Sequence, residues 1–264
     1  MCGIAGYSVG SGSRLCRTLA AQALLAGIAE RGADAVGYAF GDATRLETHK
    51  QQTGASALLE SIAVSPTATR ALVHVRDYTK GHPTIPANNH PVRHGRVTGI
   101  HNGIVLNDDE LFEHHGFTRQ EPEMTVDSEI IFALVDAYGT RPAVLEKLYG
   151  SLAAAWIDER DTDTVHLARG VGRPLWIGRG RHEVLFASTR AALEVAERTL
   201  GATLRKTEVA EGRLLTLVAG KLVAERRWSP DRGYREEREL PAVRAPQEGS
   251  FCLERLATLT TLAV

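Results

Sequence analysis

The sequence predicts a mixed α+β domain in which helices cover sheets. Short apolar segments of strand-like composition alternate with longer segments of helical periodicity along most of the 264 residues. This order, with hairpins beside helices, is typical of layered α+β domains. A hydrophobic fraction of 43% and a charged fraction of 24% fit a globular protein that buries a core.

The first half of the chain is predicted to be rich in strands. Apolar residues from Leu15 to Ile28 recur near helical spacing and Gly32 ends this segment, which predicts a helix over residues 14–32. Asn102-Gly103 interrupts residues 96–107, and because this dipeptide favours positive φ and a tight turn, we expect a strand pair there. Further strands are expected at residues 3–9, 35–40, 45–51 and 70–79, and a short helix at 55–63.

The second half is predicted to begin with helices and to end with strands. Helices are expected at residues 108–116, 126–139, 141–150 and 189–201. Strands are expected at residues 151–159, 164–170, 174–180 and 183–188, and a hairpin at 212–228. From Ser229 the chain becomes charged and rich in proline. We therefore expect one domain over residues 2–228, and a linker and tail over 229–264 with a short helix at 251–264.

Charge and composition exclude several classes of protein. The formal net charge of −1 gives no electrostatic reason to expect nucleic acid or an anionic membrane as a partner. Neither a transmembrane stretch nor a secretory signal is recognisable. The three cysteines, Cys2, Cys16 and Cys252, have no paired spacing and favour reduced thiols in the cytoplasm. The ten histidines form no metal-binding pattern, so we expect no metal site.

Cys2 follows the initiator methionine directly and precedes an apolar strand. A free thiol titrates near ~8.5 and needs a base to become a nucleophile. Once the methionine is removed, the α-amine of Cys2 itself titrates near ~7.7–8.0 and is such a base. The pair has the chemistry of an N-terminal nucleophile, although a cysteine at position 2 is by itself weak support.

Six segments in order resemble the class II glutamine amidotransferase family, the glutaminase domain of asparagine synthetase and glucosamine-6-phosphate synthase. They are MCGIAGY, ERGADAVGYAF, HVRDYTKG, NNHPV, HNGIVLND and VDSE. The resemblance implies a four-layer αββα sandwich of the N-terminal nucleophile hydrolase type. It also implies hydrolysis of L-glutamine to glutamate and ammonia through a γ-glutamyl thioester on Cys2, without a cofactor. Asn102 and the backbone N–H of Gly103 would form the oxyanion hole, as donors on a tight turn.

The same resemblance implies how glutamine is held. Arg76 would bind the α-carboxylate through its guanidinium fork and Asp127 the α-ammonium. Thr79 would line the same end of the pocket, and Gly32 and Asp34 would shape the site. Without the resemblance, these residues have ordinary interpretations: an arginine at a strand end, an N-cap aspartate, and, at residues 102–103, a hairpin turn.

Two departures from the family pattern lie just after Arg76, in the segment that corresponds to the family's glutamine loop. Asp77 stands where the synthetases carry an aromatic residue, and Lys80 replaces a histidine often found there. With few residues after 228, we expect a separate synthase or synthetase to accept the ammonia, with residues 229–264 as its docking segment. Two alternatives stay open: an amidohydrolase acting on another γ-glutamyl compound, and a glutamine-binding regulatory protein that has lost catalysis.

Overall fold

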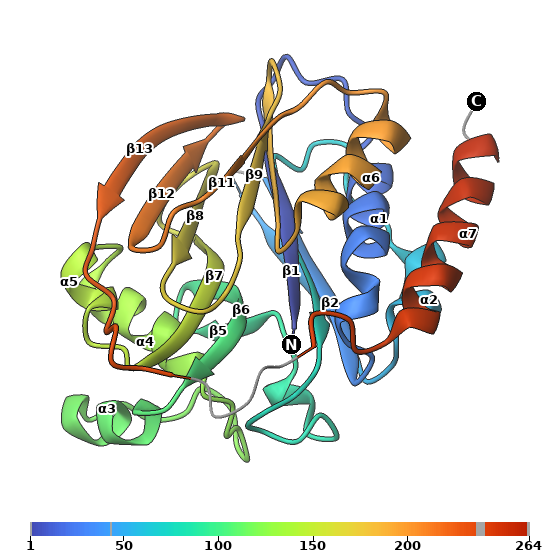
Figure 1. The fold of residues 1–264 in the computed structure, drawn as a ribbon. Coiled ribbons are helices and arrows are strands. Elements are labelled where there is room, and N and C mark those ends of the chain that lie inside the picture. Colours follow the sequence, from blue (N-terminus) through green and yellow to red (C-terminus); the bar gives the residue numbers. More distant parts are fainter. Residues whose placement is uncertain (1, 43, 236–240, 263–264) are drawn as a thin grey trace.

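Two antiparallel sheets packed face to face form the centre of the molecule (Figure 1). The computed structural model describes residues 2–42, 44–235 and 241–262. The first sheet has the strand order β11-β9-β10-β1-β4-β2-β3, and the second has the order β13-β12-β8-β7-β6-β5. The first contains β1 (Gly3–Val9), β2 (Ala35–Gly41), β3 (Leu46–Gln51), β4 (Arg70–Arg76), β9 (Trp176–Arg179), β10 (Glu183–Ala187) and β11 (Arg205–Glu208). The second contains β5 (Val92–His94), β6 (Val97–Val105), β7 (Gly150–Asp158), β8 (Thr164–Arg169), β12 (Arg213–Val218) and β13 (Lys221–Arg227).

Helices cover the outer face of each sheet, which confirms the predicted four-layer αββα sandwich (Figure 1). The first sheet is covered by α1 (Arg17–Ile28), α2 (Ala55–Leu58) and α6 (Arg190–Leu200), and α7 (Pro246–Leu262) packs against α1 and α2. The second is covered by α3 (Asp108–His115), α4 (Glu129–Tyr138) and α5 (Pro142–Leu145). Short 3-10 turns lie at Ala29–Arg31, Leu59–Ser61 and Pro86–Asn88. No described helix combines the length and the apolar composition needed to span a bilayer.

Alternation along the strands divides the core into three parts. In β7, Ala153, Ala155 and Ile157 point between the sheets, while Ala154 and Trp156 pack under α4 and α5. Successive side chains of a strand point to opposite faces, so one strand supplies two cores. The core between the sheets is therefore built from every second residue of both sheets, and the functional residues described below follow the same rule.

The prediction of a tight turn at Asn102-Gly103 is wrong. All residues of β6 from Val97 to Val105 pair with β7, without a reversal. Gly103 does have a positive φ, +150°, but within the strand, opposite Leu152. The dipeptide favours a turn locally, and pairing with β7 along its whole length overrides that preference.

The sequence-based prediction missed two strands and the start of one helix. The strand β5 is three residues long and lies in a segment expected to be a loop. The strand β11 was not expected, because an edge strand with the sequence RKTE shows no apolar alternation. Helix α7 begins at Pro246, five residues before the expected start at residue 251, with proline in the first turn where it is tolerated. The helix packs against α1 and buries Cys252 and Leu256, so the described end of the charged segment joins the helical layer.

Candidate active site

Cys2, Arg76 and Asn102 face the same space at one end of the sandwich. Side chains two or four positions apart in a strand point to the same face. Ile4, Leu72 and Ile100 point between the sheets, so Cys2, Arg76 and Asn102 do as well. Gly3 pairs with Val75 in the register of β1 and β4, so the next position of that register sets Cys2 opposite Arg76. Asn102 approaches from β6 of the other sheet, which packs against β1 and β4.

A small cavity joins most of the predicted site residues. Its volume is about 10 Å3, which is room for about one water molecule. Five predicted residues line it: Cys2, Arg76, Thr79, Gly103 and Asp127. Six residues that the sequence analysis had not singled out as site residues complete the lining: Tyr78, Lys80, His90, His101, Val126 and Ser128.

The Cys2 thiol is held at the end of the strand. Its Sγ donates a hydrogen bond to the backbone oxygen of Asp77 at 3.4 Å. Burial raises the pKa of the thiol, and the hydrogen bond and the charge of Arg76 oppose that effect. The sulfur therefore rests as a thiol, and a reaction at Cys2 needs a base to remove its proton.

Gly103 of the second sheet lines the cavity together with Cys2, whereas its neighbour Asn102 is not among the lining residues. Asn102 is fully buried, and within the described chain neither its Nδ2 nor its Oδ1 has a hydrogen-bond partner. Buried amides of this kind are nearly always bonded, so an unused donor here suits a ligand atom. Gly103 has no room for a side chain, because a Cβ atom would lie 2.0 Å from the oxygen of Ser151.

Arg76 is buried and already has protein partners. Its Nη1 donates to Asn89 Oδ1 at 2.6 Å, and its Nη2 donates to the backbone oxygens of Lys80, at 2.9 Å, and Gly81. Burial lowers the pKa of this guanidinium, while Cys2 and Asp127 raise it. The loop after β4 thus folds back over the arginine and closes one side of the cavity.

Asp127 lies just before α4 and reaches the same cavity. Its Oδ2 accepts a hydrogen bond from the N–H of Val105 at 2.7 Å. Burial raises the pKa of the carboxyl to about 6, against the hydrogen bond from Val105, which lowers it. Near neutral pH the group is an anion in a poorly hydrated place, where a cation would stabilise it.

Gly32 and Asp34 do not line the cavity. They contact the backbone of Arg76 and Tyr78, which do line it. A Cβ atom at residue 32 would lie 2.4 Å from the backbone oxygen of Arg76. The N–H of Asp34 donates to that same oxygen at 3.0 Å, and its Oδ2 accepts from the N–H of Tyr78 at 2.9 Å. Both residues therefore act on the loop that follows Arg76.

Arg31 was not singled out from the sequence, although it stands inside the ERGADAVGYAF segment. It is buried, its Nε donates to the backbone oxygen of Cys2 at 2.9 Å, and among the described residues its Nη2 has no acceptor. Burial lowers its pKa, and proximity to Cys2 raises it. The signal that points to it is the position directly before Gly32 in a quoted motif.

Two buried histidines, His90 and His101, line the cavity, and a third, His74, packs against His90. The rings of His74 and His90 stack with centroids 4.2 Å apart, and His101 bonds Ser128 through Nδ1 at 2.9 Å. Burial lowers the pKa of His74 to about 3 and that of His101 to about 4, and lowers that of His90. All three rings are therefore neutral at neutral pH, and they form a rigid wall rather than a charged one.

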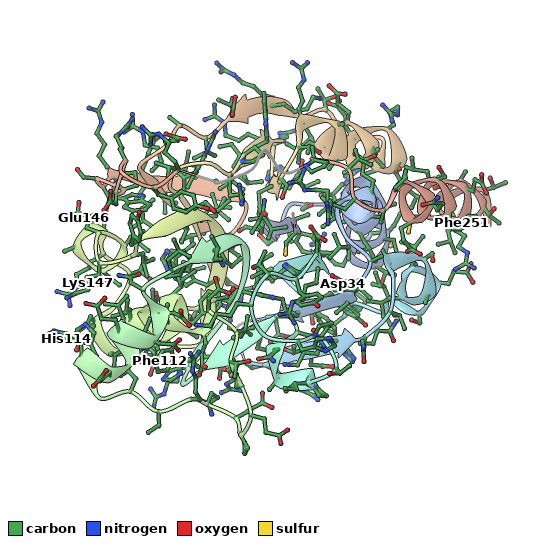
Figure 2. The ribbon with its side chains drawn as sticks, turned by 60° about the horizontal axis from the view of Figure 1, so that its bottom comes forward. Asp34, Phe112, His114, Glu146, Lys147 and Phe251 are labelled. Atoms are coloured by element: carbon green, nitrogen blue, oxygen red, sulfur yellow. The ribbon has the colours of Figure 1, made fainter. Side chains whose placement is uncertain are left out.

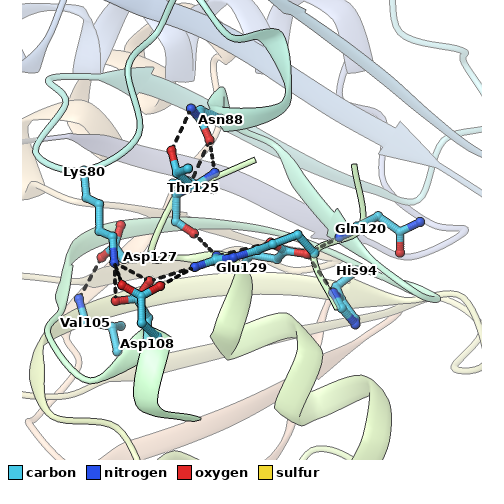
Figure 3. A network of polar contacts seen from close by, with 12 residues as sticks. Lys80, Asn88, His94, Val105, Asp108, Gln120, Thr125, Asp127 and Glu129 are labelled. Atoms are coloured by element: carbon cyan, nitrogen blue, oxygen red, sulfur yellow. Dashed lines mark hydrogen bonds and ion pairs between the residues drawn. The ribbon is translucent and has the colours of Figure 1, made fainter. Parts of the chain in front are cut away.

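An ion-pair network anchors Lys80, one of the residues that line the cavity (Figure 3). Lys80 binds Asp108 and Asp109, and Arg119 bridges both of these carboxylates to Glu129. Within the described chain, no group of three histidine, cysteine or acidic side chains could hold a metal ion. The acidic residues beside the site are thus matched by lysine and arginine.

Comparisons with known proteins find several that are similar in sequence. A family model described as "Glutamine amidotransferase domain" matches residues 81–195. Glutamine–fructose-6-phosphate aminotransferase (isomerizing) of Caulobacter vibrioides is 34% identical over 172 residues, which cover 62% of this chain and 28% of that protein. The enzyme of the same name from Bradyrhizobium diazoefficiens is 32% identical over 202 residues, covering 73% and 32%. The chain thus spans about a third of the length of these relatives.

Solved structures share the fold. Glutamine phosphoribosylpyrophosphate amidotransferase from B. subtilis, complexed with ADP and GMP, superposes with a TM-score of 0.68 at 23% identity, covering 86% of this chain and 49% of that one. This likeness shows that the chain shares the two-sheet α+β fold of that amidotransferase. The family model and the sequence relatives together show that the chain contains a class II glutamine amidotransferase domain.

Proposed function

We propose that the protein hydrolyses L-glutamine to glutamate and ammonia and passes the ammonia to a separate synthase or synthetase. The observation that carries this proposal is the single cavity that Cys2, Arg76, Thr79, Gly103 and Asp127 share. Cys2 offers a nucleophile, Arg76 and Lys80 offer positive charge, and Asp127 offers negative charge. A zwitterionic amino acid with a reactive side-chain amide requires that combination.

The proposed reaction begins with removal of Met1, which frees the α-amine of Cys2. The amine takes the thiol proton, and the sulfur attacks the side-chain amide carbon of glutamine. Asn102 Nδ2 and the N–H of Gly103 donate to the resulting oxyanion, and such donors are typically worth roughly 3 kcal/mol each. The amine returns the proton to the leaving nitrogen, ammonia departs, and water then hydrolyses the thioester to glutamate.

In the proposed complex, Arg76 binds the α-carboxylate of glutamine and Asp127 binds its α-ammonium, with Thr79 beside them. A cavity of about 10 Å3 is too small for glutamine. Residues 77–81 must therefore move outward for glutamine to enter and then close over it. Gly32 and Asp34 act as the fixed base against which this loop moves.

The test is the release of ammonia from glutamine by processed protein. Cys2→Ala should abolish it while leaving folding and glutamine binding intact, and Cys16→Ala, at an exposed position, should not change it. Intact-mass analysis of active protein should show Met1 missing. Ammonia release by Cys2→Ala at the original rate would refute the mechanism.

Two other functions are separated by the same assay. Faster hydrolysis of another γ-glutamyl amide would identify a different substrate, because Arg76 and Asp127 contact only the amino-acid end. Glutamine binding in calorimetry without ammonia release from processed protein would identify a regulatory glutamine-binding protein.

The acceptor of ammonia would be a separate protein, and the glutaminase unit would span residues 2–228. Residues 229–264 remain the proposed docking segment. Because Cys252 and Leu256 of α7 are buried, deleting the helix would expose the core. Substitution of Phe251, which is 52% exposed on the outer side of α7, is the better test (Figure 2). Phe251→Ser should weaken glutamine-dependent synthesis by the assembled pair and spare intrinsic glutaminase.

A further inference from the structure

The C-terminal segment of the chain crosses the end of the sandwich where the site lies. Figure 1 shows the chain approaching α7 close to the N-terminus. The backbone N–H groups of Arg244 and Ala245 both donate to the oxygen of Glu30, at 2.8 Å each. Glu248 accepts from the N–H and hydroxyl of Ser56, at 2.8 and 3.0 Å. The segment is therefore anchored at the backbone of Arg244 and on its C-terminal side, through contacts that do not use the side chain of Arg244.

The side chain of Arg244 reaches the residue next to the nucleophile. Its Nε lies 3.1 Å from Asp77 Oδ2. Asp77 accepts the hydrogen bond of Cys2 Sγ through its backbone oxygen and directly follows Arg76 in the chain. One residue thus connects the C-terminal segment, the sulfur and the arginine proposed to bind the substrate.

We infer that Arg244 is a positioning residue that acts through Asp77 to hold the glutamine loop, residues 77–81, in its closed form. This inference rests on the proposed function, because Arg244 would influence how the same site closes. It also gives a physical reason for the departure noted at position 77. An aspartate replaces the aromatic residue of the synthetases, and the chain supplies a cation from a segment 167 positions further on to match it.

The size of the effect follows from the exposure of the pair. The side chain of Arg244 is 43% exposed and that of Asp77 is 21% exposed, so the attraction is screened by solvent. However, the backbone anchors of residues 244–248 already order the arginine, so little further entropy is lost when the pair forms. We expect loss of the pair to shift the loop equilibrium by about two- to fivefold.

The experiment compares five proteins: wild type, Arg244→Glu, Asp77→Arg, the double variant with both changes, and Arg255→Glu as a matched control. Arg255 lies on α7, is 46% exposed and pairs with Glu60 at 3.6 Å. Each processed protein is studied by two experiments, steady-state kinetics and alkylation of Cys2. The kinetics give KM and kcat for glutamine, and mass spectrometry follows the rate at which iodoacetamide alkylates Cys2.

We expect Arg244→Glu and Asp77→Arg to raise KM and to speed alkylation of Cys2 by about two- to fivefold, with little change in kcat. The double variant should return KM and the alkylation rate toward wild type, and Arg255→Glu should leave both unchanged. Equal effects of Arg244→Glu and Arg255→Glu, or no recovery in the double variant, would overturn the inference.

The two readouts separate this inference from the proposed function. If wild type releases no ammonia but alkylation follows the expected pattern, the proposed function fails and the role of Arg244 holds. If wild type hydrolyses glutamine but Arg244→Glu alters neither KM nor alkylation, the proposed function stands and the role of Arg244 is refuted.

Discussion

Lys80 Nζ lies 2.7 Å from both carboxylate oxygens of Asp108, whose side chain is only 1% exposed (Figure 3). Burial opposes the charge of Lys80, but its hydrogen bonds to Asp108 and Asp109 outweigh burial and raise its pKa. The backbone oxygen of Lys80 accepts from Arg76. The lysine thus ties the glutamine loop to α3, and it does so at the second position where the chain departs from the family pattern.

Lys80→Met should destabilise the protein. It leaves the buried carboxylate of Asp108 with Arg119 as its remaining cation. Breaking a fully buried pair costs about 3–5 kcal/mol, and because Lys80 is about one-third exposed we expect roughly 1–2 kcal/mol. Urea unfolding at pH 7 measures this loss. Asp109→Asn is the matched control, since Asp109 binds the same two cations but is 76% exposed. Equal losses in both variants would contradict the argument.

Glutamine binding should weaken as the pH falls through about 6, the pKa to which burial raises Asp127. Protonation removes the negative charge that we propose holds the α-ammonium, so KM should rise about tenfold per pH unit well below 6. Steady-state kinetics between pH 5 and 8 tests this. Asp127→Asn should have a high KM with that pH dependence removed. A wild-type KM that is flat across the range would exclude Asp127 from binding.

The same carboxyl should affect stability in the opposite direction. Its folded pKa is raised from the ordinary 3.8 to about 6, so between these values the folded state binds more protons than the unfolded state. The contribution of Asp127 to the free energy of unfolding therefore falls as the pH rises across this window. Denaturant unfolding of wild type and Asp127→Asn at pH 4, 5, 6 and 7 should show the variant gaining stability relative to wild type with rising pH.

Asn102→Ala should reduce kcat by about a hundredfold or more and change KM little, because in the proposed mechanism the donor it removes acts on the oxyanion in the transition state. The amide forms no hydrogen bond within the described chain, so the fold should survive, as circular dichroism can verify. If KM rises and kcat does not fall, the side chain binds the ground state and the oxyanion role is incorrect.

Gly103→Ala should prevent folding or activity, whereas Gly116→Ala should be tolerated. Both glycines have positive φ, +150° and +64°. At residue 103 a Cβ atom would lie 2.0 Å from the oxygen of Ser151, and at residue 116 it would meet nothing within 4 Å. The second change therefore costs about 1 kcal/mol of backbone strain, and the first adds a clash inside the sheet. Thermal unfolding compares them, and similar melting temperatures would contradict this account.

The sequence by itself determined the layered α+β class and the residue types of the site. The alternation and helical periodicity are local properties, and so is the order of the quoted segments. Arg76 and Asp127 could be singled out because the quoted segments resemble the glutamine amidotransferases, and Cys2 also because a thiol beside a free α-amine has the chemistry of a nucleophile. Even the positive φ of Gly103 followed from the dipeptide.

Only the tertiary structure decided how these parts meet. The strand β6 runs straight through Asn102 because pairing with β7, about fifty residues away, outweighs a local turn preference. Asp34 fixes the loop instead of lining the cavity, and Arg244 reaches Asp77 across most of the chain. Such contacts join residues far apart in sequence, so their energies depend on burial and distance that neither residue carries alone.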